Sequence, residues 1–379
     1  MTRLIRHPLK RMGVAALDLA LGPFSKKRPL PASPSRILLC RLDHLGDVLL
    51  TTPAIRAVKQ RYPESDLHVL VKPWSKPALL HNPYIDQLLC FDADWTRALS
   101  GPVVDPLLRE RKKLVSHLES ARYDIAVDLA GDLRSIRLLA GARPGCLIGP
   151  AWKGGRAWLD IEARPDIRSH AVRQNLDVVA CMDAKTNELN PQFFPSSDSR
   201  IFADRYLSGI PAREGARIIL HPGAAHPAKR WPTDRFTELT RRLLKEGHLI
   251  LALCGPGEED TMASFMNLTG SQEGLIAMPK MDLDRVGACL ERVDAFIGND
   301  TGTAHLAQAV GCRSAVLFGP TDPSRFGPLD LERNRVVQSK HPDAPCWWPE
   351  TGNRRPKCDL MAEISIDSAH ASLLELLKA

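Results

Sequence analysis

Short apolar runs alternate with amphipathic stretches along most of the first half of the chain. RILLCRL begins at Arg36, the helical stretch TTPAIRAVKQRYP follows from Thr51, and then come DLHVLVK, DQLLCFD and YDIAVDL. Apolar runs of this length between turn residues are typical of buried parallel strands. Strands that alternate with helices predict βαβ units, so we expect the α/β class with a parallel sheet.

The second half repeats the pattern. We predict strands for RIILH, HLILALC, VDAFIGN and SAVLF, an amphipathic helix for FTELTRRLLKE that ends at Gly247, and a helix for TGTAHLAQAV that ends at Gly311. The last residues, IDSAHASLLELLKA, are typical of a terminal amphipathic helix. Two α/β lobes of this kind bind ligands at the carboxyl ends of their strands.

The strand and helix pattern is interrupted between the two halves. Residues 141–195 are rich in Pro, Gly and Arg, and we expect loops there with one or two helices. The predicted organisation is a basic amphipathic N-terminal extension at 1–35, a Rossmann-like lobe at 36–205, a second at 206–335, and a C-terminal loop and terminal helix at 336–379.

Composition narrows the choice of partner and compartment. The net charge of +7 suits an acidic partner such as a nucleotide, a phosphorylated sugar or an anionic membrane surface. Basic residues are dispersed outside the extension, which argues against nucleic acid. Nine cysteines, mostly single within apolar runs, fit buried thiols in a reducing compartment, so we expect a cytoplasmic protein.

The N-terminal extension has three interpretations. As an amphipathic helix it places Leu4, Ile5, Leu9, Met12 and Leu17 near one face, with Arg3, Arg6, Lys10 and Arg11 around them. A basic, partly disordered extension fits the sequence equally well. A cleaved secretory signal fits least, because Asp18 interrupts the apolar core. Membrane-surface contact through residues 1–28 therefore stays an open alternative.

The segment GNDTGTAHLAQAVG is a candidate phosphate site. Asn299 and Asp300 end a strand, and Thr301, Gly302 and Thr303 open a helix whose free N–H groups favour an anion. Gly302 allows close approach, either threonine can donate a hydroxyl, and His305 lies one turn further along the helix. The alternative is that Asp300 and Thr301 only cap the helix.

Two more segments follow strands of the second half. In HPGAAHPAKRWP, Lys229 is either a solvated charge or a cation for a leaving phosphate. In CGPGEED, Glu258, Glu259 and Asp260 are candidates for binding ribose hydroxyls. In the first half, Asp43 and Asp47 flank Gly46 after the first strand. A carboxylate there serves either as a general base or as a helix cap.

Together, RLDHLGDVLLTTPAIRAVKQRYP, HPGAAHPAKRWP and GNDTGTAHLAQAVGCRSAVLFGPTDPSRFGP resemble glycosyltransferase family 9, the ADP-heptose:lipopolysaccharide heptosyltransferases. The resemblance covers residues 36–328. It implies an enzyme with a GT-B fold, in which two Rossmann-like lobes with parallel sheets face a cleft. It also implies an inverting transfer that needs no metal and no cofactor. The N-terminal lobe would bind a lipid-linked saccharide acceptor, and the C-terminal lobe a nucleotide-diphosphate sugar donor such as ADP-heptose.

The resemblance also implies roles for single residues. Asp47 matches the general base of the family, and Lys229 its phosphate-binding lysine. The donor-binding block matches Asp300, Thr301, Gly302 and His305, next to Thr303. Its ribose-binding glutamate falls on Glu258 or Glu259, which the sequence does not separate. The enzyme would work at the cytoplasmic face of the inner membrane, on lipopolysaccharide-core or related glycan acceptors.

Three rival functions remain at this stage. One is a metal-dependent transferase that uses Asp92-x-Asp94 or Asp282-x-Asp284, although such pairs are common by chance. Another is a non-catalytic nucleotide-sugar-binding protein. The third is a transferase of the same fold that uses a different nucleotide sugar. The first loop departs from the family at Asp43 and His44, where small or hydroxyl residues are usual, and the stretch from Gly141 has no counterpart in the resemblance.

Overall fold

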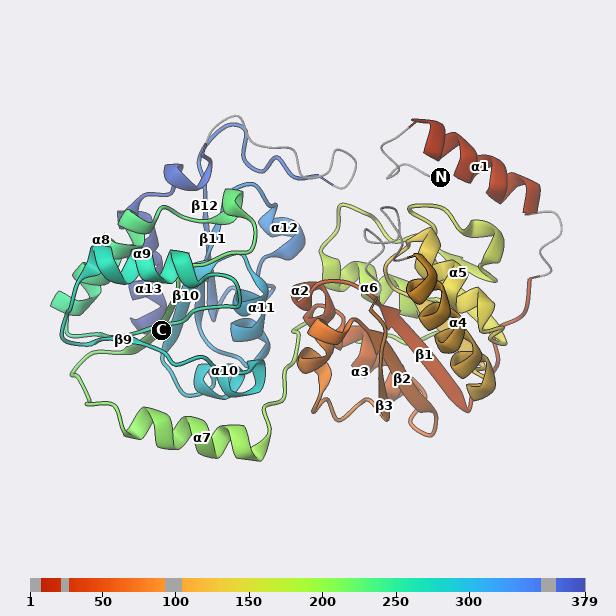
Figure 1. Ribbon diagram of the computed structural model, residues 1–379, viewed down its shortest axis with the longest axis horizontal. Helices are drawn as coiled ribbons and strands as arrows, with labels where there is room; N and C mark the ends of the chain where they lie inside the picture. Colours follow the sequence, from red (N-terminus) through yellow and green to blue (C-terminus); the bar gives the residue numbers. More distant parts are fainter. Residues whose placement is uncertain (1–7, 22–26, 93–103, 349–358, 379) are drawn as a thin grey trace. The chain divides into compact units, whose positions relative to one another are not determined.

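The structure is a computed structural model that describes residues 8–21, 27–92, 104–348 and 359–378 (Figure 1). The chain divides into two compact units, unit 1 at Met1–Leu189 and unit 2 at Asn190–Ala379. Each unit is built around one parallel sheet, which confirms the predicted α/β class. Of the helices described, none combines the length and apolar character needed to cross a membrane.

Unit 1 holds a six-stranded sheet in the order β3-β2-β1-β4-β5-β6, with every neighbouring pair parallel. Leu39 in β1 lies opposite Val69 and Val127, and all three are almost fully buried, as expected of a sheet covered on both faces. The strands are β1 (Arg36–Arg41), β2 (Asp66–Val71), β3 (Gln87–Cys90), β4 (Ile125–Asp128), β5 (Cys146–Pro150) and β6 (Ile161–Ala163).

The helical stretch predicted from Thr51 is confirmed, because TPAIRAVKQR forms α3 with Thr51 at its N-cap. Its first seven residues are buried, and Pro53 stands at a helix start, where its missing N–H is harmless. The helices are α1 (Pro8–Leu21), α2 (Leu45–Leu49), α3 (Thr52–Arg61), η2 (Pro73–Leu79), α4 (Val104–Ala121), α5 (Leu133–Gly141), η4 (Arg156–Trp158) and α6 (Ala171–Ala180).

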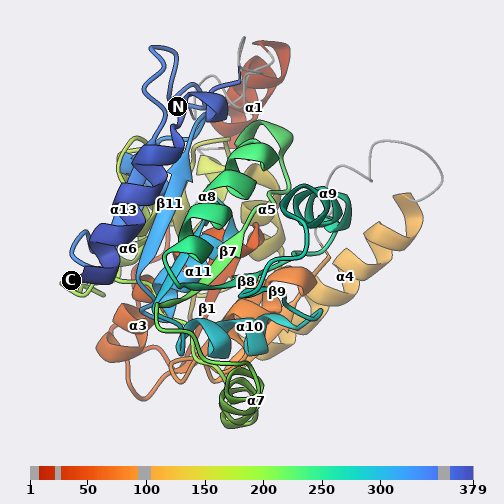
Figure 2. The same ribbon diagram turned by 90° about the vertical axis from the view of Figure 1, so that its left-hand side faces the viewer.

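Unit 2 holds a second parallel six-stranded sheet, in the order β12-β11-β10-β7-β8-β9. Figure 2 shows α8 and α13 packed together on this unit, and residues from both helices join one hydrophobic core with the strands. The strands are β7 (Arg217–His221), β8 (Leu249–Ala252), β9 (Leu275–Ala277), β10 (Ala295–Asn299), β11 (Ser314–Phe318) and β12 (Asn334–Gln338).

The predicted helices of the second half are confirmed. FTELTRRLLK lies in α8, Gly247 and Gly311 follow α8 and α11 at positive φ, and the terminal helix is α13. The helices are α7 (Ser197–Ser208), η5 (Pro227–Lys229), α8 (Thr233–Lys245), α9 (Glu259–Thr269), α10 (Leu283–Leu290), α11 (Gly302–Ala309), α12 (Pro323–Phe326), η6 (Met361–Glu363) and α13 (Ile366–Lys378).

The expectation of loops across residues 141–195 was wrong in part, because this stretch adds β5 and β6 to the sheet of unit 1. CLIGP is buried between β4 and β6, yet it follows Pro144 and Gly145 and itself ends in a proline, and these turn residues concealed it. Strand β6 is only three residues long. Strands this short carry too little of the period-two pattern to be recognised from sequence.

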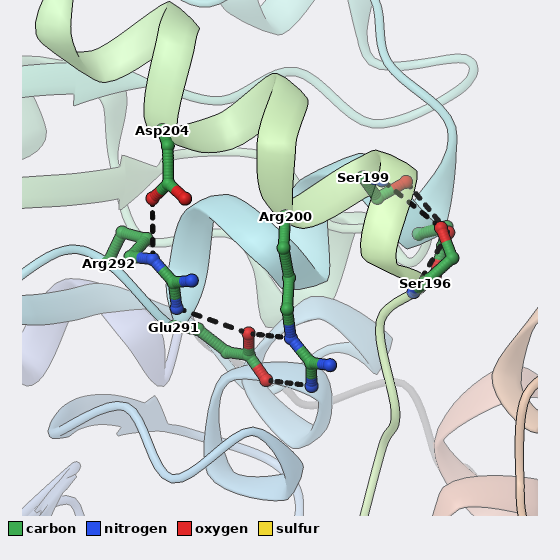
Figure 3. Close-up of polar contacts among 7 residues, drawn as sticks. Ser196, Ser199, Arg200, Asp204, Glu291 and Arg292 are labelled. Carbon is green, nitrogen blue, oxygen red and sulfur yellow. Dashed lines mark hydrogen bonds and ion pairs between the residues drawn. The ribbon is translucent and has the colours of Figure 1, made fainter.

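The division between the units falls earlier than the boundary expected near residue 205, because α7 packs on α10 of unit 2. Asp284 accepts hydrogen bonds from the Ser196 and Ser199 hydroxyls at 2.5 and 2.7 Å. Next to Ser199 on α7, Arg200 forms a two-pronged ion pair with Glu291 (Figure 3). These bonds connect residues about 90 positions apart, which a local pattern does not reveal.

Candidate functional site

The carboxyl ends of neighbouring strands in unit 2 carry polar residues on one edge of the sheet. Strand β7 ends at His221, β10 ends at Asn299, and Thr321 follows β11. Because β11, β10, β7 and β8 are parallel neighbours, these ends lie together at the edge where open α/β sheets bind ligands.

Asp300 is the centre of a buried polar cluster on this edge. Its Oδ2 accepts from Lys229 Nζ at 2.6 Å and from Thr321 Oγ1 at 2.7 Å, and its main-chain oxygen accepts from Lys229 at 3.1 Å. His305 Nε2 lies 3.7 Å from Oδ1. Lys229 therefore does not extend freely into solvent, because its ammonium group is held against a carboxylate that is only 3 % exposed.

Burial and charge act in opposite directions on this cluster. Burial alone would raise the pKa of Asp300, but Lys229, His305 and the Thr321 hydroxyl together hold it below its usual value. Burial also lowers the pKa of His305, and Asp300 offsets this only in part. The cluster therefore combines an ionised carboxylate, an ammonium ion and a neutral imidazole at neutral pH.

The loop that opens α11 presents polar atoms that lack partners. Thr301 occupies the N-cap position, yet its side chain makes no capping hydrogen bond, so the capping interpretation fails for this residue. Thr301 Oγ1 and His305 Nδ1 are both buried without a hydrogen-bond partner among the described residues. Buried polar atoms are rarely left unpaired without a reason, and a bound ligand is one such reason.

Glu258 lies in a second buried cluster on the same edge. Its Oε2 accepts from His221 Nε2 at 2.6 Å and from the Gly255 amide at 2.9 Å. A Cβ at Gly223 or Gly255 would overlap this carboxylate, so a larger residue at either position would have to displace it. Burial opposes ionisation, but the hydrogen bonds from His221 and Gly255 bring the pKa of Glu258 below its usual value. Glu259 begins α9 and is exposed.

Asn299 makes hydrogen bonds to the loops next to both clusters. Its amide donates to the Pro222 and Gly223 carbonyls at 3.0 Å, and its side-chain oxygen accepts from the Trp231 amide. Trp231 is 1 % exposed and donates its indole N–H to Ile364, so it anchors the Lys229 loop to the body of unit 2. The segment after β12 adds Trp347, whose ring centroid lies 5.8 Å from Lys229 Nζ.

Unit 1 carries a different set of charges at the end of β1. Arg41 Nε lies 3.1 Å from Asp43, and its terminal nitrogens lie 3.4 Å from Asp47 and 2.6 Å from the Leu129 carbonyl. Neither aspartate caps α2, because its N-cap residue is His44. Asp47 lies in the first turn of α2 with its side chain 26 % exposed, which leaves the carboxylate reachable by a second molecule.

Asp128, at the end of the neighbouring strand β4, is fully buried. Its Oδ2 accepts from the Gly131 amide at 2.6 Å, while Oδ1 is without a hydrogen-bond partner in the described structure. Burial raises the pKa of Asp128 to about 7, against the lowering effect of the Gly131 hydrogen bond and of the Arg41 charge. Unit 1 thus has a second carboxyl group at the carboxyl ends of its strands, but this one is buried where Asp47 is partly exposed.

A cavity of about 520 Å³ in unit 2 lies away from these groups. It is lined by residues that precede β10, β11 and β12, which places it at the amino ends of the strands. Two of its arginines, Arg200 and Arg292, are paired with Glu291. We therefore place the candidate site at the opposite edge of the sheet.

Of the two aspartate pairs with D-x-D spacing, one has structural roles and the other includes a residue outside the described ones. Asp282 caps α10, and Asp284 binds Ser196 and Ser199. Asp94 lies outside the described residues. Within residues 8–21, 27–92, 104–348 and 359–378, no three His, Cys, Asp or Glu side chains gather as a metal-binding group.

The structure brings most of the candidate donor-binding residues of unit 2 to one sheet edge and separates Glu258 from Glu259. Sequence reasoning did not assign roles to Arg41, His221 or Thr321, which hold Asp47, Glu258 and Asp300. For Arg41 and His221 the sequence did contain a signal, because each is an ionisable residue at the end of an apolar strand. The residues placed at this edge are Lys229, Glu258, Asp300, Thr301, Gly302, Thr303 and His305.

Comparisons with known proteins identify relatives that match most of the chain. A sequence model of glycosyltransferase family 9 (heptosyltransferase) matches residues 111–352. Lipopolysaccharide heptosyltransferase 3 of Escherichia coli (strain K12) is 25% identical over 284 residues, which are 73% of this chain and 80% of that protein. Lipopolysaccharide heptosyltransferase 2 of the same strain is 24% identical over 320 residues, 80% of this chain and 88% of that protein.

Solved structures show the same fold. A glycosyl transferase family 9 protein from Veillonella parvula superposes with a TM-score of 0.77 at 20% identity, covering 93% of this chain and 99% of that one. The E. coli heptosyltransferase WaaC, solved with ADP, gives 0.68 at 20% identity, covering 90% and 99%. These likenesses confirm the expected GT-B fold.

Proposed function

The chain belongs to glycosyltransferase family 9, and from this premise we propose that it moves heptose from ADP-heptose to a lipopolysaccharide-core or related lipid-linked saccharide. Family membership makes it a heptosyltransferase-like glycosyltransferase. The names of its relatives, lipopolysaccharide heptosyltransferases, support the acceptor. The nucleotide in the similar WaaC structure, ADP, supports the donor.

The observation that carries this proposal is the cluster around Asp300 at the start of α11. An ammonium group has three N–H donors, and Asp300 takes two from Lys229, which leaves one for a phosphate oxygen. The unpartnered Thr301 hydroxyl and the N–H groups that open α11 supply further donors. A diphosphate suits this set of one cation and several donors better than a neutral ligand does.

The proposed reaction is a single displacement that inverts the anomeric carbon. Asp47 takes the proton from an acceptor hydroxyl, whose oxygen forms the new bond to that carbon. The bond from the carbon to the diphosphate oxygen breaks on the opposite face, and the nucleoside diphosphate keeps the electron pair. Lys229 and the α11 amides stabilise the charge that develops on the leaving group, so the proposed reaction needs no metal ion and no cofactor.

We assign ribose binding to Glu258 rather than Glu259. The Oε2 of Glu258 is used by His221 and Gly255, which fixes the carboxylate and leaves Oε1 to accept from a ribose hydroxyl. Glu259 is exposed on α9 and has no comparable support.

Membrane-surface contact by residues 1–28 belongs to the same proposal. A lipid-linked acceptor lies at a bilayer surface, and the compartment expected from the sequence puts the enzyme at the cytoplasmic face. No nucleic acid takes part. The competing functions are a non-catalytic nucleotide-sugar-binding protein and a transferase that uses another nucleotide sugar.

The test is calorimetric binding of ADP, UDP, GDP and CDP, each with and without chelator. We expect ADP to bind most tightly and equally well with chelator. Lys229→Ala should weaken ADP binding by about 10- to 100-fold, the range for a lost hydrogen bond to a charged group. The exposed Lys245→Ala serves as the charge-matched control, and thermal melting of both variants checks folding.

Other outcomes would redirect the proposal. Preference for another nucleotide would keep the reaction type and replace the donor, while a requirement for metal would remove the metal-free mechanism. Unchanged ADP affinity in Lys229→Ala would remove the phosphate role of this lysine. If none of the four nucleotides binds, the chain does not use a donor of this class.

A further inference from the structure

Helix α1 is held on unit 1 by a specific contact. The Asp18 carboxylate accepts from the backbone amides of Gly155 and Ala157 at 3.3 and 3.2 Å, and Val14 lies over Gly154. Gly154 and Gly155 have φ of +94° and +97°, a conformation that strongly favours glycine. A Cβ at Gly154 would also overlap Val14. Gly154 and Gly155, which lie in the stretch where we expected loops, are therefore the point at which α1 docks on unit 1.

The chain after α1 is fixed to the same part of unit 1. Arg28 pairs with Asp160 at 2.7 Å and donates to the Pro144 carbonyl, and Lys27 donates to the Leu159 carbonyl. The basic residues at 27 and 28 thus anchor the segment to the lobe. Helix α1 lies outside the helices that cover the sheet of unit 1 (Figure 1).

The face of α1 that points away from the lobe is apolar. Leu9, Met12, Ala16 and Leu19 recur at the i, i+3, i+7 and i+10 positions of one helix face. All four are exposed, the three large side chains by 72, 66 and 77 %. Val14 and Asp18 lie on the opposite, docked face. An amphipathic helix ordinarily buries its apolar side against the protein, and α1 presents an apolar side outward.

The charges of this region identify the partner. Asp18 is the one acidic residue before Asp43 in the sequence, and its carboxylate is used in docking. Arg3, Arg6, Lys10 and Arg11 are basic residues in and before the helix. An exposed apolar stripe in a segment whose sequence is rich in cations fits the interface of an anionic bilayer, where apolar side chains enter the acyl boundary and cations meet the headgroups.

We propose that α1 is a docked membrane-contact helix, which presents Leu9, Met12, Ala16 and Leu19 to an anionic lipid surface while Asp18 fixes it to unit 1. Because the helix is docked, it fixes the orientation of unit 1 on the bilayer. A flexible tether would hold unit 1 near the bilayer without orienting it. Only this orienting role rests on the proposed transfer to a lipid-linked acceptor. The lipid contact itself stands on the exposed face and the charges.

The first test is co-sedimentation of the full-length protein with phosphatidylglycerol-containing vesicles and with phosphatidylcholine vesicles. The variant Leu9→Glu/Met12→Glu/Leu19→Glu should lose binding to the anionic vesicles by about 100-fold or more, because three apolar side chains no longer enter the interface. The matched control is Leu80→Glu/Ile201→Glu/Leu331→Glu, which alters three apolar residues elsewhere that are also more than half exposed and should bind like the wild type.

Two results would overturn the proposal. One is equal binding of the α1 variant and the wild type. The other is absence of wild-type binding to anionic vesicles; if light scattering then shows a wild-type dimer that the α1 variant abolishes, a second copy of the chain covers this face instead of lipid.

The second test separates docking from binding. Asp18→Ala should speed hydrogen exchange at the Gly155 and Ala157 amides and leave vesicle binding in place. Transfer to an acceptor embedded in vesicles should then fall about tenfold, while transfer to a soluble acceptor analogue stays unchanged. Equal activity on both acceptors would remove the orienting role. Failure of the wild type on both acceptors would count against the proposed function and leave the vesicle result valid.

Discussion

The two units carry charged residues at the same edge of similar sheets, but they hold them differently. In unit 2, Asp300 and Glu258 are buried, and each is fixed by at least two hydrogen bonds. In unit 1, Asp47 is partly exposed and lies at 3.4 Å from Arg41, which it shares with Asp43. A preformed site suits a ligand that is the same in every cycle, such as a nucleotide. An open carboxylate suits a group that must meet a second substrate.

The largest effect should come from removing the partly exposed carboxylate of unit 1. Asp47→Ala should reduce turnover by about 10²- to 10⁴-fold, the contribution of a general base, and leave donor affinity nearly unchanged. Steady-state rates and calorimetry measure the two quantities. Asp43→Ala is the control, because Asp43 shares the Arg41 pairing and should keep most of the activity. An equal fall in donor affinity for Asp47→Ala would show that Asp47 is not the base.

The second effect concerns the buried carboxyl groups, whose pKa values shift in opposite directions. Asp128 has a pKa raised to about 7, so the folded state binds this proton more tightly than the unfolded chain does. Its contribution to stability is therefore lost as the pH rises from about 4 to about 7, by up to about 4 kcal/mol. Asp300 and Glu258 have lowered pKa values, and their contribution is present above about pH 4 and lost below it.

Hydrogen exchange of β4 and β10 amides, measured between pH 4 and 8, tests this separately in each unit. Asp128→Asn should flatten the loss of protection that β4 shows with rising pH, and leave β10 unaffected. If β4 protection in the wild type is constant across this range, Asp128 does not titrate there.

The smallest effects are expected from two threonine substitutions in unit 2, one of which should change stability and the other ligand binding. Thr321 donates to Asp300, so Thr321→Val should lower the free energy of unfolding by about 1.5–3 kcal/mol. Thr301 has a buried hydroxyl without a partner in the described part of the chain, so Thr301→Val should leave stability unchanged and weaken ADP binding about fivefold. Melting and calorimetry of the two variants provide the contrast. A destabilised Thr301→Val would indicate that the hydroxyl supports the fold and not a ligand.

The local sequence pattern was sufficient to predict an element where its conformation depends mainly on its own residues. RILLCR and RIILH are continuous apolar runs and form central strands, and FTELTRRLLK forms α8 with its apolar face in the core. CLIGP and IEA were missed because they are short and flanked by Gly, Pro and charged residues. Their strand conformation depends on pairing with β4 and with each other, which no window of sequence contains.

The same division applies to the candidate site. Chemistry-bearing residues such as Lys229, Asp300 and His305 stand out because they follow strands or open a helix, so the sequence by itself determined the class, the lobes and the candidate groups. Only the tertiary structure decided which partners they have. The choice of Glu258 over Glu259 depends on His221, and the docking of α1 depends on Gly155, in each case through residues far apart in the chain. Hydrogen bonds of that kind are set by packing, because only folding brings distant segments within hydrogen-bonding distance of one another.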